Sequence, residues 1–195
     1  MATSDLDIRR RRMVERIYAD FKGVTREGGV SWSESIVVDS YGDEDDQAAA
    51  RASDVETDWM ALVNDPNWVV SVGKGGWSFL DAIGTRYYVA PAMVRQLEER
   101  LPRAASFAES TQCLEYSLDI SGEGRLADWH RDKFSTFTVR QRRCVRGFLK
   151  LMVYVEEQQR PGDAVVNASG GEECFEKWKR LLERWTEEWC AAGLE

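Results

Sequence analysis

The chemistry open to this chain is limited by its single histidine. His130 lies in the stretch DWHRDK between Asp128 and Asp132, so a general base would have to be this imidazole or a carboxylate. A zinc site with several histidines cannot form within one chain. Cys113 could act as a nucleophile with His130 as its base, but no nucleophile elbow is present. We expect His130 to lie in a polar loop, and we assign no catalytic residue, metal ligand or cofactor.

A second candidate cluster lies in the stretch FLDAIGTRYYVAPAMV, residues 79–94. Its polar and aromatic side chains could line a small-ligand pocket made by Asp81, Arg86, Tyr87 and Tyr88. The structural alternative is an aspartate that caps a turn, a corner at Gly84 and a short strand at RYYVA that hands over to a helix at Pro91. In a strand the two tyrosines would point to opposite faces, one toward the core and one outward. We favour this structural alternative.

Charge is unevenly distributed in a chain whose net charge is −8. Residues 39–58 carry eight acidic side chains against one arginine, and residues 131–150 carry seven basic side chains against one aspartate. The second block contains the basic face of a predicted helix, with Arg140, Arg143, Arg146 and Lys150 as its candidate phosphate contacts. Because the net charge would repel a polyanion, we expect pairing with the acidic block of the same molecule and not with nucleic acid. The run of arginines at 9–12 should splay around its helix and form no single patch.

Aromatic residues form a narrow stripe near the C-terminus. The stretch EECFEKWKRLLERWTEEWCAAG is helical by its periodicity, with its charges opposite an apolar stripe roughly 120° wide. Tryptophan is enriched in protein contacts, so the stripe supplies candidate protein-binding residues: Phe175, Trp178, Trp185 and Trp189. An exposed stripe of this kind must be covered. We expect the helix to dock on its own domain, and docking on a second copy or another protein is the functional alternative.

The other patterns predict a mainly helical domain with a small β element, an α+β fold. Periodicity and capping boxes predict helices over residues 5–21 and 32–39, two short helices up to Leu62, and a long helix that follows Thr138. The stretch SIVVD within 32–39 would alone also suit a strand. RYYVA predicts a short strand, and the alternation in LEYSLDI favours a second strand that could pair with it, with a short helix as the alternative for LEYSLDI. We therefore expect one mostly helical domain over residues 1–159, a linker over 160–171 and a C-terminal amphipathic helix over 172–195.

The cellular compartment is predicted from three features of the sequence. No stretch approaches the roughly 18 uncharged apolar residues of a membrane span. The N-terminal sequence lacks the apolar core of a secretory signal. The four cysteines form no Cys-x-x-Cys pair and are expected to be reduced. These features predict a cytoplasmic protein without a membrane partner.

Three stretches taken together resemble a bacterial family of unknown function, found as small stand-alone proteins. They are DSYGDEDD, FLDAIGTRYYVAPAMV and the segment from LEYSLD to VRQRRCVRGFLKLMVYV. The family shows, in this order, a Tyr-Gly turn, a Phe-Leu-Asp…Arg-Tyr-Tyr…Met segment and a late Phe…Thr…Gln…Phe-Leu helix. The resemblance covers residues 13–155 and leaves the linker and the tryptophan helix outside. It implies a compact, mostly helical domain and no established activity.

These observations favour a non-catalytic protein-binding module, comparable to an immunity or accessory protein. Its partner would be another protein or a second copy, the latter giving a homodimer. The first alternative is an enzyme or a small-ligand binder that uses the corner at residues 81–88 or the His130 stretch. The second is a nucleic-acid contact through the basic face at residues 140–150.

Overall fold

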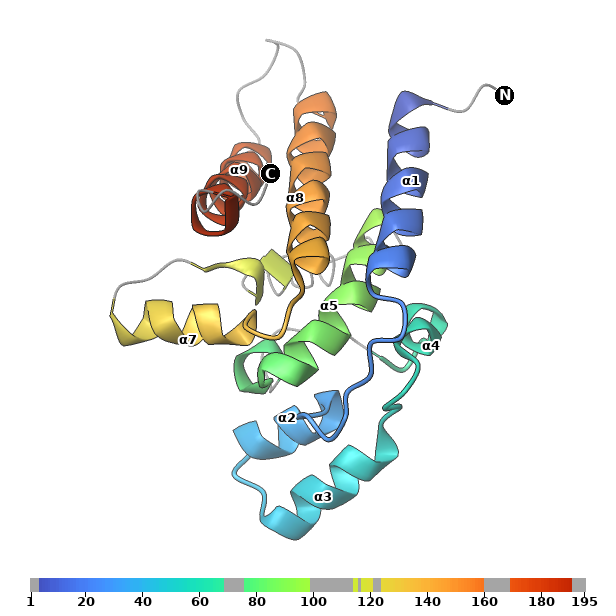
Figure 1. Cartoon of the computed structure of the whole chain (residues 1–195), viewed down its shortest axis with the longest axis vertical. Helices are drawn as coiled ribbons and strands as arrows, with labels where there is room; N and C mark the ends of the chain where they lie inside the picture. The colour runs from blue at the N-terminus through green and yellow to red at the C-terminus, as the bar shows by residue number, and fades with distance from the viewer. Residues whose placement is uncertain are drawn as a thin grey trace.

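The computed structural model of this chain describes residues 4–68, 76–98, 114–115, 117–120, 124–159 and 169–190. Within these ranges the regular elements are helices and no strand is present (Figure 1). The α-helices are α1 (Asp5–Asp20), α2 (Trp32–Asp39), α3 (Glu44–Ser53), α4 (Trp59–Asn64), α5 (Ala82–Leu97), α7 (Arg125–Lys133), α8 (Val139–Gln159) and α9 (Ser169–Cys190). A 3₁₀ turn, η1 (Gly76–Phe79), precedes α5. The fold is all-α, so the predicted α+β fold with a small β element is wrong.

The first predicted strand, RYYVA, lies inside α5. The Asp81 carboxylate caps this helix by accepting a hydrogen bond of 2.7 Å from the Gly84 N–H. From residue 84 onward α5 is buried on almost every side, which is typical of a helix that is apolar all round. Pro91 lies within the helix and does not begin it. Burial from all directions overrode the strand preference of the tyrosines and valine.

Two other segments also differ from their predictions. In LEYSLDI, residues 114–115 and 117–118 are helical and not extended. The predicted polar loop around His130 is the helix α7. The N-cap residue of this helix is Gly124, whose φ is 57°. Glycine has no side chain that could accept a capping hydrogen bond, so the sequence contains no N-cap signal there.

Most other helices were predicted correctly because their N-terminal caps are encoded locally. The Ser31 hydroxyl accepts a hydrogen bond of 3.1 Å from the Glu34 N–H, and the Glu34 carboxylate accepts one from the Ser31 N–H. Ser4 and Asp7 form the same reciprocal pair at the start of α1. Such pairs satisfy N–H groups that the first helical turn cannot satisfy itself.

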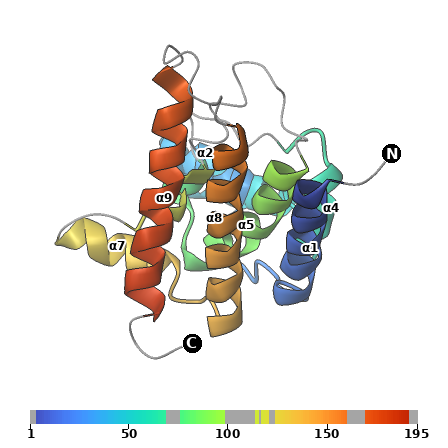
Figure 2. The ribbon, with the colours of Figure 1, turned by 90° about the horizontal axis from the view of Figure 1, so that it is seen from above.

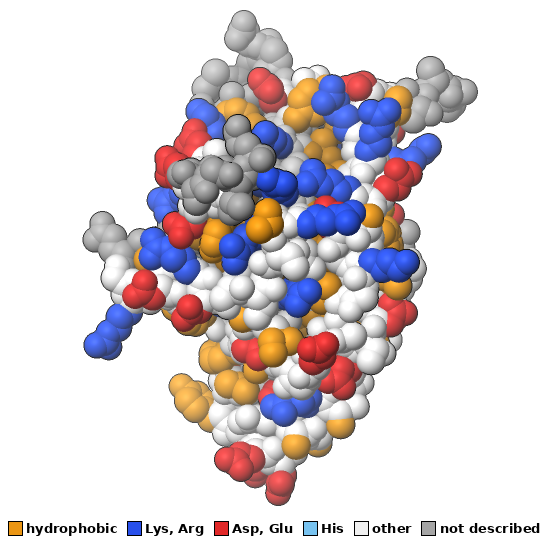
Figure 3. All heavy atoms as spheres, in the orientation of Figure 1, with side chains coloured by type: hydrophobic (Ala, Val, Ile, Leu, Met, Phe, Trp, Pro, Cys, Tyr) orange, Lys and Arg blue, Asp and Glu red, His pale blue; other side chains and the backbone are white. Residues whose placement is uncertain are grey.

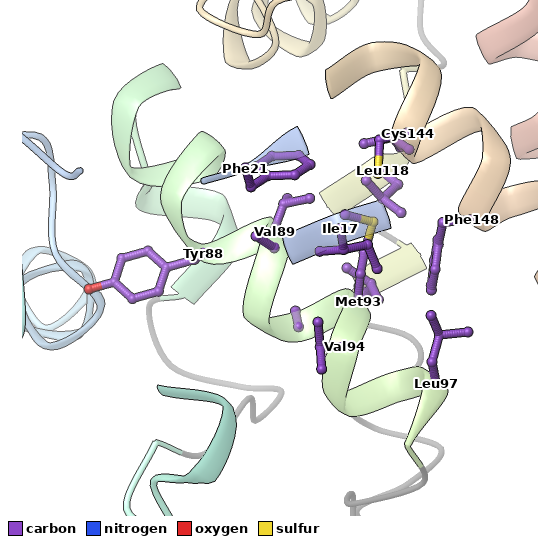
Figure 4. Close-up of a cluster of buried hydrophobic side chains, with 14 of the residues drawn as sticks. Ile17, Phe21, Tyr88, Val89, Met93, Val94, Leu97, Leu118, Cys144 and Phe148 are labelled. Carbon is purple, nitrogen blue, oxygen red and sulfur yellow. The ribbon is translucent and has the colours of Figure 1, made fainter. Parts of the chain in front are cut away.

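The core gathers around α5, which lies between the other helices (Figures 1 and 4). In Figure 4, side chains of α1, α5 and α8 meet there with Phe21, which follows α1, and with Leu118 of the segment at residues 117–120. The labelled residues of the three helices include Ile17, Val89, Met93, Cys144 and Phe148. Tyr88 extends from α5 away from this cluster, toward α2. The core therefore joins the two ends of the molecule through one central helix.

Two helices flank α8, with α9 on one side and α1 on the other (Figure 2). The α2–α3 pair lies at the opposite end of the long axis (Figure 1). The C-terminal helix begins at Ser169, earlier than the predicted 172, while residues 160–168 of the predicted linker and residues 191–195 lie outside the described residues. This arrangement leaves the face between α1 and α8 open.

Candidate functional site: a basic groove between α1 and α8

Four cationic side chains line a groove of about 470 Å³ between α1 and α8. Arg9, Arg12 and Arg16 recur on α1 at intervals of three and four residues, which places them on one side of that helix. The fourth cation, Lys150, comes from α8. In Figure 3 the Lys and Arg side chains gather over the part of the molecule that α1 and α8 form. A chain with a net charge of −8 therefore concentrates positive charge in one concave place.

The floor of the groove is apolar. Met13 of α1 and Leu151 of α8 line it between the cations, and both side chains are buried. Gly147 lets the two helices approach closely at this point. A Cβ atom at residue 147 would lie 2.9 Å from Arg16 Nη1 and 3.6 Å from Met13 Sδ. The groove thus offers an apolar surface with positive charge at its edges.

Two carboxylates of the chain neutralise part of this charge. Asp5 forms an ion pair of 2.6 Å with Arg9 Nε and accepts a hydrogen bond of 3.2 Å from the Tyr154 hydroxyl. The hydrogen bond from Arg9 holds the pKa of Asp5 below its usual range. At the other end, Asp20 accepts from Arg16 Nε at 3.2 Å and also pairs with a cation of α8. Arg9 and Arg16 are therefore already engaged.

Arg12 and Lys150 remain available for a ligand. Both side chains are exposed, and within the part of the chain that the structure describes neither forms a hydrogen bond or a close ion pair. The charge of Arg12 does act on Asp5, where it helps to lower the pKa of that carboxyl. They face the groove from its two helices. The guanidinium of Arg9 also lies 4.7 Å from the centre of the Tyr154 ring, which fixes an aromatic surface at the end of the groove. An anionic group with an apolar neighbour is the chemistry that this arrangement accommodates.

The predicted basic face of α8 does not act as one surface. Lys150 lines the groove, whereas Arg140 pairs with Asp20 of α1. Arg143 also has an interaction partner, and Arg146 is half-buried. Pairing between this face and the acidic block of residues 39–58 is not what the structure shows. The α3 part of that block lies at the other end of the molecule (Figure 1).

The corner residues make separate contacts in the fold. Asp81 caps α5 and also accepts a hydrogen bond of 3.2 Å from the Val30 N–H. Arg86 donates to Gln141 Oε1 at 3.1 Å. These contacts lead to different neighbours and do not converge on one cavity.

The two tyrosines of the corner are both buried, so the expected division into one inward and one outward ring is wrong. Their ring centres lie 5.0 Å apart, and the Tyr88 hydroxyl accepts a hydrogen bond of 2.9 Å from the Trp32 N–H. Burial raises the pKa of Tyr87 and of Tyr88. Neither phenol is poised to ionise near neutral pH.

His130 lies on α7 and is buried, with its ring 4.8 Å from that of Trp129. Burial lowers the pKa of His130, and the charge of Lys133 lowers it further. Cys113, the thiol considered as its partner, lies outside the described residues. Within the described ranges, no three His, Cys, Asp or Glu side chains are grouped so that they could hold a metal ion.

Lys133 is a buried cation that the sequence analysis did not single out. Its ammonium group donates a hydrogen bond of 2.8 Å to the Trp77 carbonyl and lies 3.7 Å from the centre of the Trp129 ring. Burial lowers the pKa of Lys133 to about 8. The sequence predicts a loop at this position, and a lysine in a loop is expected to be solvated, so the burial of Lys133 was not predicted.

The aromatic stripe of α9 faces the protein's own core. Trp178 and Trp185 are fully buried, and Trp189 and Phe175 are half-buried. Trp185 Nε1 donates to the Leu118 carbonyl at 2.7 Å. At the end of the stripe, the Arg142 guanidinium of α8 lies 3.9 Å from the centre of the Trp189 ring. In this structure the four candidate protein-binding residues are used mainly for packing on α8.

Of the eight residues that line the groove, only Lys150 is a candidate site residue in the sequence, and Arg9, Arg12, Arg16 and Tyr154 are not. A signal existed for the arginines, because positions 9, 12 and 16 are spaced for one helical side. Within the run at 9–12 neighbouring side chains do splay around the helix, and only the addition of Arg16 reveals a common side. The pairing of α1 with α8 could not be read from the sequence.

None of the helices in the described ranges combines the length and the apolarity that a bilayer crossing requires. In the part of the chain that the structure describes, the protein is thus all-α and carries a basic, partly apolar groove.

Residues 9–187 match the model of a family described as "Family of unknown function (DUF6714)", and the chain belongs to this family. No curated protein and no solved structure matches the chain. The expected resemblance to a family of unknown function is confirmed, but its expected extent of residues 13–155 is wrong. The match includes almost all of α9, so the tryptophan helix is part of the family's domain.

Proposed function

We propose that this chain is a non-catalytic protein-binding module that holds an acidic, partly apolar segment of a protein in the groove between α1 and α8. The observation that supports it is the combination of two unpaired cations, Arg12 and Lys150, with the apolar floor of Met13 and Leu151. A helix or loop that carries carboxylates beside an apolar side chain would satisfy both features. The expectation of an immunity-like or accessory role stays a prediction.

A protein segment suits this groove better than a nucleic acid. Nucleic-acid binding draws most of its affinity from many phosphate contacts, whereas two of the four groove cations are already neutralised by Asp5 and Asp20. The net charge of −8 adds a repulsion that a long polyanion would experience over its whole length. A short acidic segment meets only the local positive charge.

The composition of the groove supports binding and not reaction. Its lining contains arginine, lysine, tyrosine, methionine, leucine and glycine, and no carboxylate, histidine or cysteine. General acid–base catalysis near neutral pH needs a group whose pKa lies in that range. The groove residues are suited to charge pairing and to apolar contact.

A binding titration tests the proposal. The probe is a labelled amphipathic helical peptide with glutamates on one side and leucines on the other, compared with a version in which glutamines replace the glutamates. We expect R12Q/K150Q to weaken binding of the acidic peptide by about 10-fold, because exposed ion pairs contribute roughly 0.2–1 kcal/mol each. Added salt should weaken it too.

The matched control is R11Q/K179Q, which removes two exposed cations outside the groove and changes the net charge equally. It should bind the acidic peptide like the unaltered protein. Equal binding of the acidic and the glutamine peptides would overturn the proposal. So would tighter binding of a single-stranded oligonucleotide that R12Q/K150Q abolishes, which would establish nucleic acid as the ligand.

A further inference from the structure

The α2–α3 turn carries the most exposed aromatic residue of the described chain. Tyr41 is 96% exposed, and its φ of 59° lies in the left-handed region that usually favours glycine. It follows the C-cap Ser40, and the next residue closes the helix end with a hydrogen bond of 2.9 Å from the Gly42 N–H to the Val37 carbonyl. A glycine would suit position 41 better if folding alone mattered. The phenol ring makes no contribution to the core.

Unpaired carboxylates follow Tyr41 closely in the chain. Glu44, Asp45 and Asp46 form the first turn of α3, a helix without any buried residue. All three are exposed, and among the residues placed by the structure their side chains have no hydrogen-bond or ion-pair partner. Residues 39–58 as a whole carry a net charge of −7, from eight acids and one arginine. An aromatic ring next to carboxylates is the kind of segment that the groove accommodates.

We infer that the α2–α3 turn of one copy occupies the α1–α8 groove of a second copy. Tyr41 would lie on the apolar floor formed by Met13 and Leu151, with the carboxylates of the α3 first turn facing Arg12 and Lys150. This inference rests on the proposed function and names its partner. A second copy suits the groove because both halves of a charge-complementary contact are present on one chain.

The arrangement of the two surfaces determines the kind of assembly. They lie at opposite ends of the molecule, so one chain cannot join its own turn to its own groove (Figure 1). Figure 3 shows the same separation, with cations over α1 and α8 and acidic side chains at the tip that α3 forms. A contact made once between two different surfaces is head-to-tail and produces rings or open chains, whereas an antiparallel pair that makes the contact twice is a two-fold dimer.

Complementing variants test this inference by analytical ultracentrifugation of the full chain. R12E/K150E reverses the two available charges of the groove. Y41G/E44Q/D45N removes the aromatic ring and two carboxylates of the turn. Position 41 tolerates glycine because its φ is positive, so the turn variant should fold. We expect the unaltered protein to associate in a concentration-dependent manner that salt weakens, and each variant alone to stay monomeric. Their mixture should form a 1:1 complex, since one intact groove then meets one intact turn.

The control R11E/K179E reverses two exposed cations outside the groove and should associate like the unaltered protein. An unaltered protein that remains monomeric at low salt, or a mixture that forms no complex, would overturn the second-copy inference. If the acidic peptide still binds in a manner that depends on Arg12 and Lys150, the proposed function survives that result. If the peptide also fails to bind, the results contradict both the proposed function and the second-copy inference.

Discussion

The two sides of α8 are built from different residues and do different things (Figure 2). Toward α9, fully buried tryptophans contact the rings of α8 and its neighbours. For example, the ring centres of Trp178 and Phe148 lie 5.9 Å apart. Toward α1, Gly147 and the buried Met13 bring the helices together under a groove with cations at its edges. Aromatic residues that resemble a partner site in the sequence are used for folding, and the surface that we propose for a partner is the charged one.

The physical reason is that tryptophan and the charged side chains differ in the free energy of exposure to water. A tryptophan stripe left exposed would be an apolar patch, so the chain covers it with its own helix. Arginine and lysine keep their charged ends in water at little cost. Their mutual repulsion also opposes closing the groove. Three predictions test this contrast.

The largest effect is expected on the aromatic side, from W185A. The substitution removes a fully buried ring, its hydrogen bond to the Leu118 carbonyl and its edge contact with Phe134 at 4.9 Å. Large-to-small changes of this kind cost about 3–5 kcal/mol of unfolding free energy. Urea unfolding followed by circular dichroism would measure the loss.

Two controls belong to that experiment. K179A alters an exposed residue of the same helix and should change the free energy of unfolding by less than about 0.5 kcal/mol. R12Q/K150Q on the groove side should have an equally small effect, because neither cation is paired. A groove variant as unstable as W185A would remove the distinction between the two sides of α8.

A buried cation should behave in the opposite way to the groove cations, and K133M tests this. Burial holds the pKa of Lys133 at about 8, below the usual 10.5 of a lysine, so its charged form disfavours the folded state. We expect K133M to raise the free energy of unfolding at pH 7 by about 1–2 kcal/mol. This is less than the pKa shift alone would give, because the Trp77 carbonyl loses its donor.

The way in which the free energy of unfolding changes with pH tests the direction of this effect. Between about pH 8 and 10.5 the unfolded chain binds more protons at Lys133 than the folded chain does, so this residue makes stability rise with pH. Burial raises the pKa of Cys144 to about 12, which has the opposite effect above pH 9. The contribution of Cys144 is the same in the unaltered protein and in K133M, so it cancels when their free energies of unfolding are compared. A K133M variant that keeps the slope of the unaltered protein would show that Lys133 is solvated.

The smallest effect is expected from G147A at the groove. Alanine favours the helix by about 1 kcal/mol over glycine. Its Cβ would come within 2.9 Å of Arg16 Nη1, the movable end of a long side chain. We therefore expect a gain of about 0.5 kcal/mol in the free energy of unfolding, measured by urea titration, with weaker binding of the acidic peptide.

The informative companion to this variant is G84A, at a glycine whose neighbour cannot move. A Cβ at residue 84 would lie 2.4 Å from the backbone oxygen of Val30, so this helical glycine should cost about 1–3 kcal/mol when replaced. A loss of stability in G147A comparable to that in G84A would mean that the groove residues are as tightly constrained as the core.

Local sequence determined most of the helices. The reciprocal caps at Ser4, Ser31 and Thr138 place the starts of α1, α2 and α8, because each involves groups only three residues apart. Helix α7 has no such cap, and it was missed. Spacing also placed the aromatic stripe of α9 on a single helical face.

Tertiary structure decided the rest, because burial from several directions is not a local property. RYYVA is helical since α5 is surrounded by other helices, which no alternation of residues in that stretch reveals. The groove exists only because α1 lies beside α8, more than a hundred residues away in the chain. A residue's type shows what it can contact, and the packing of distant helices decides which contact it makes.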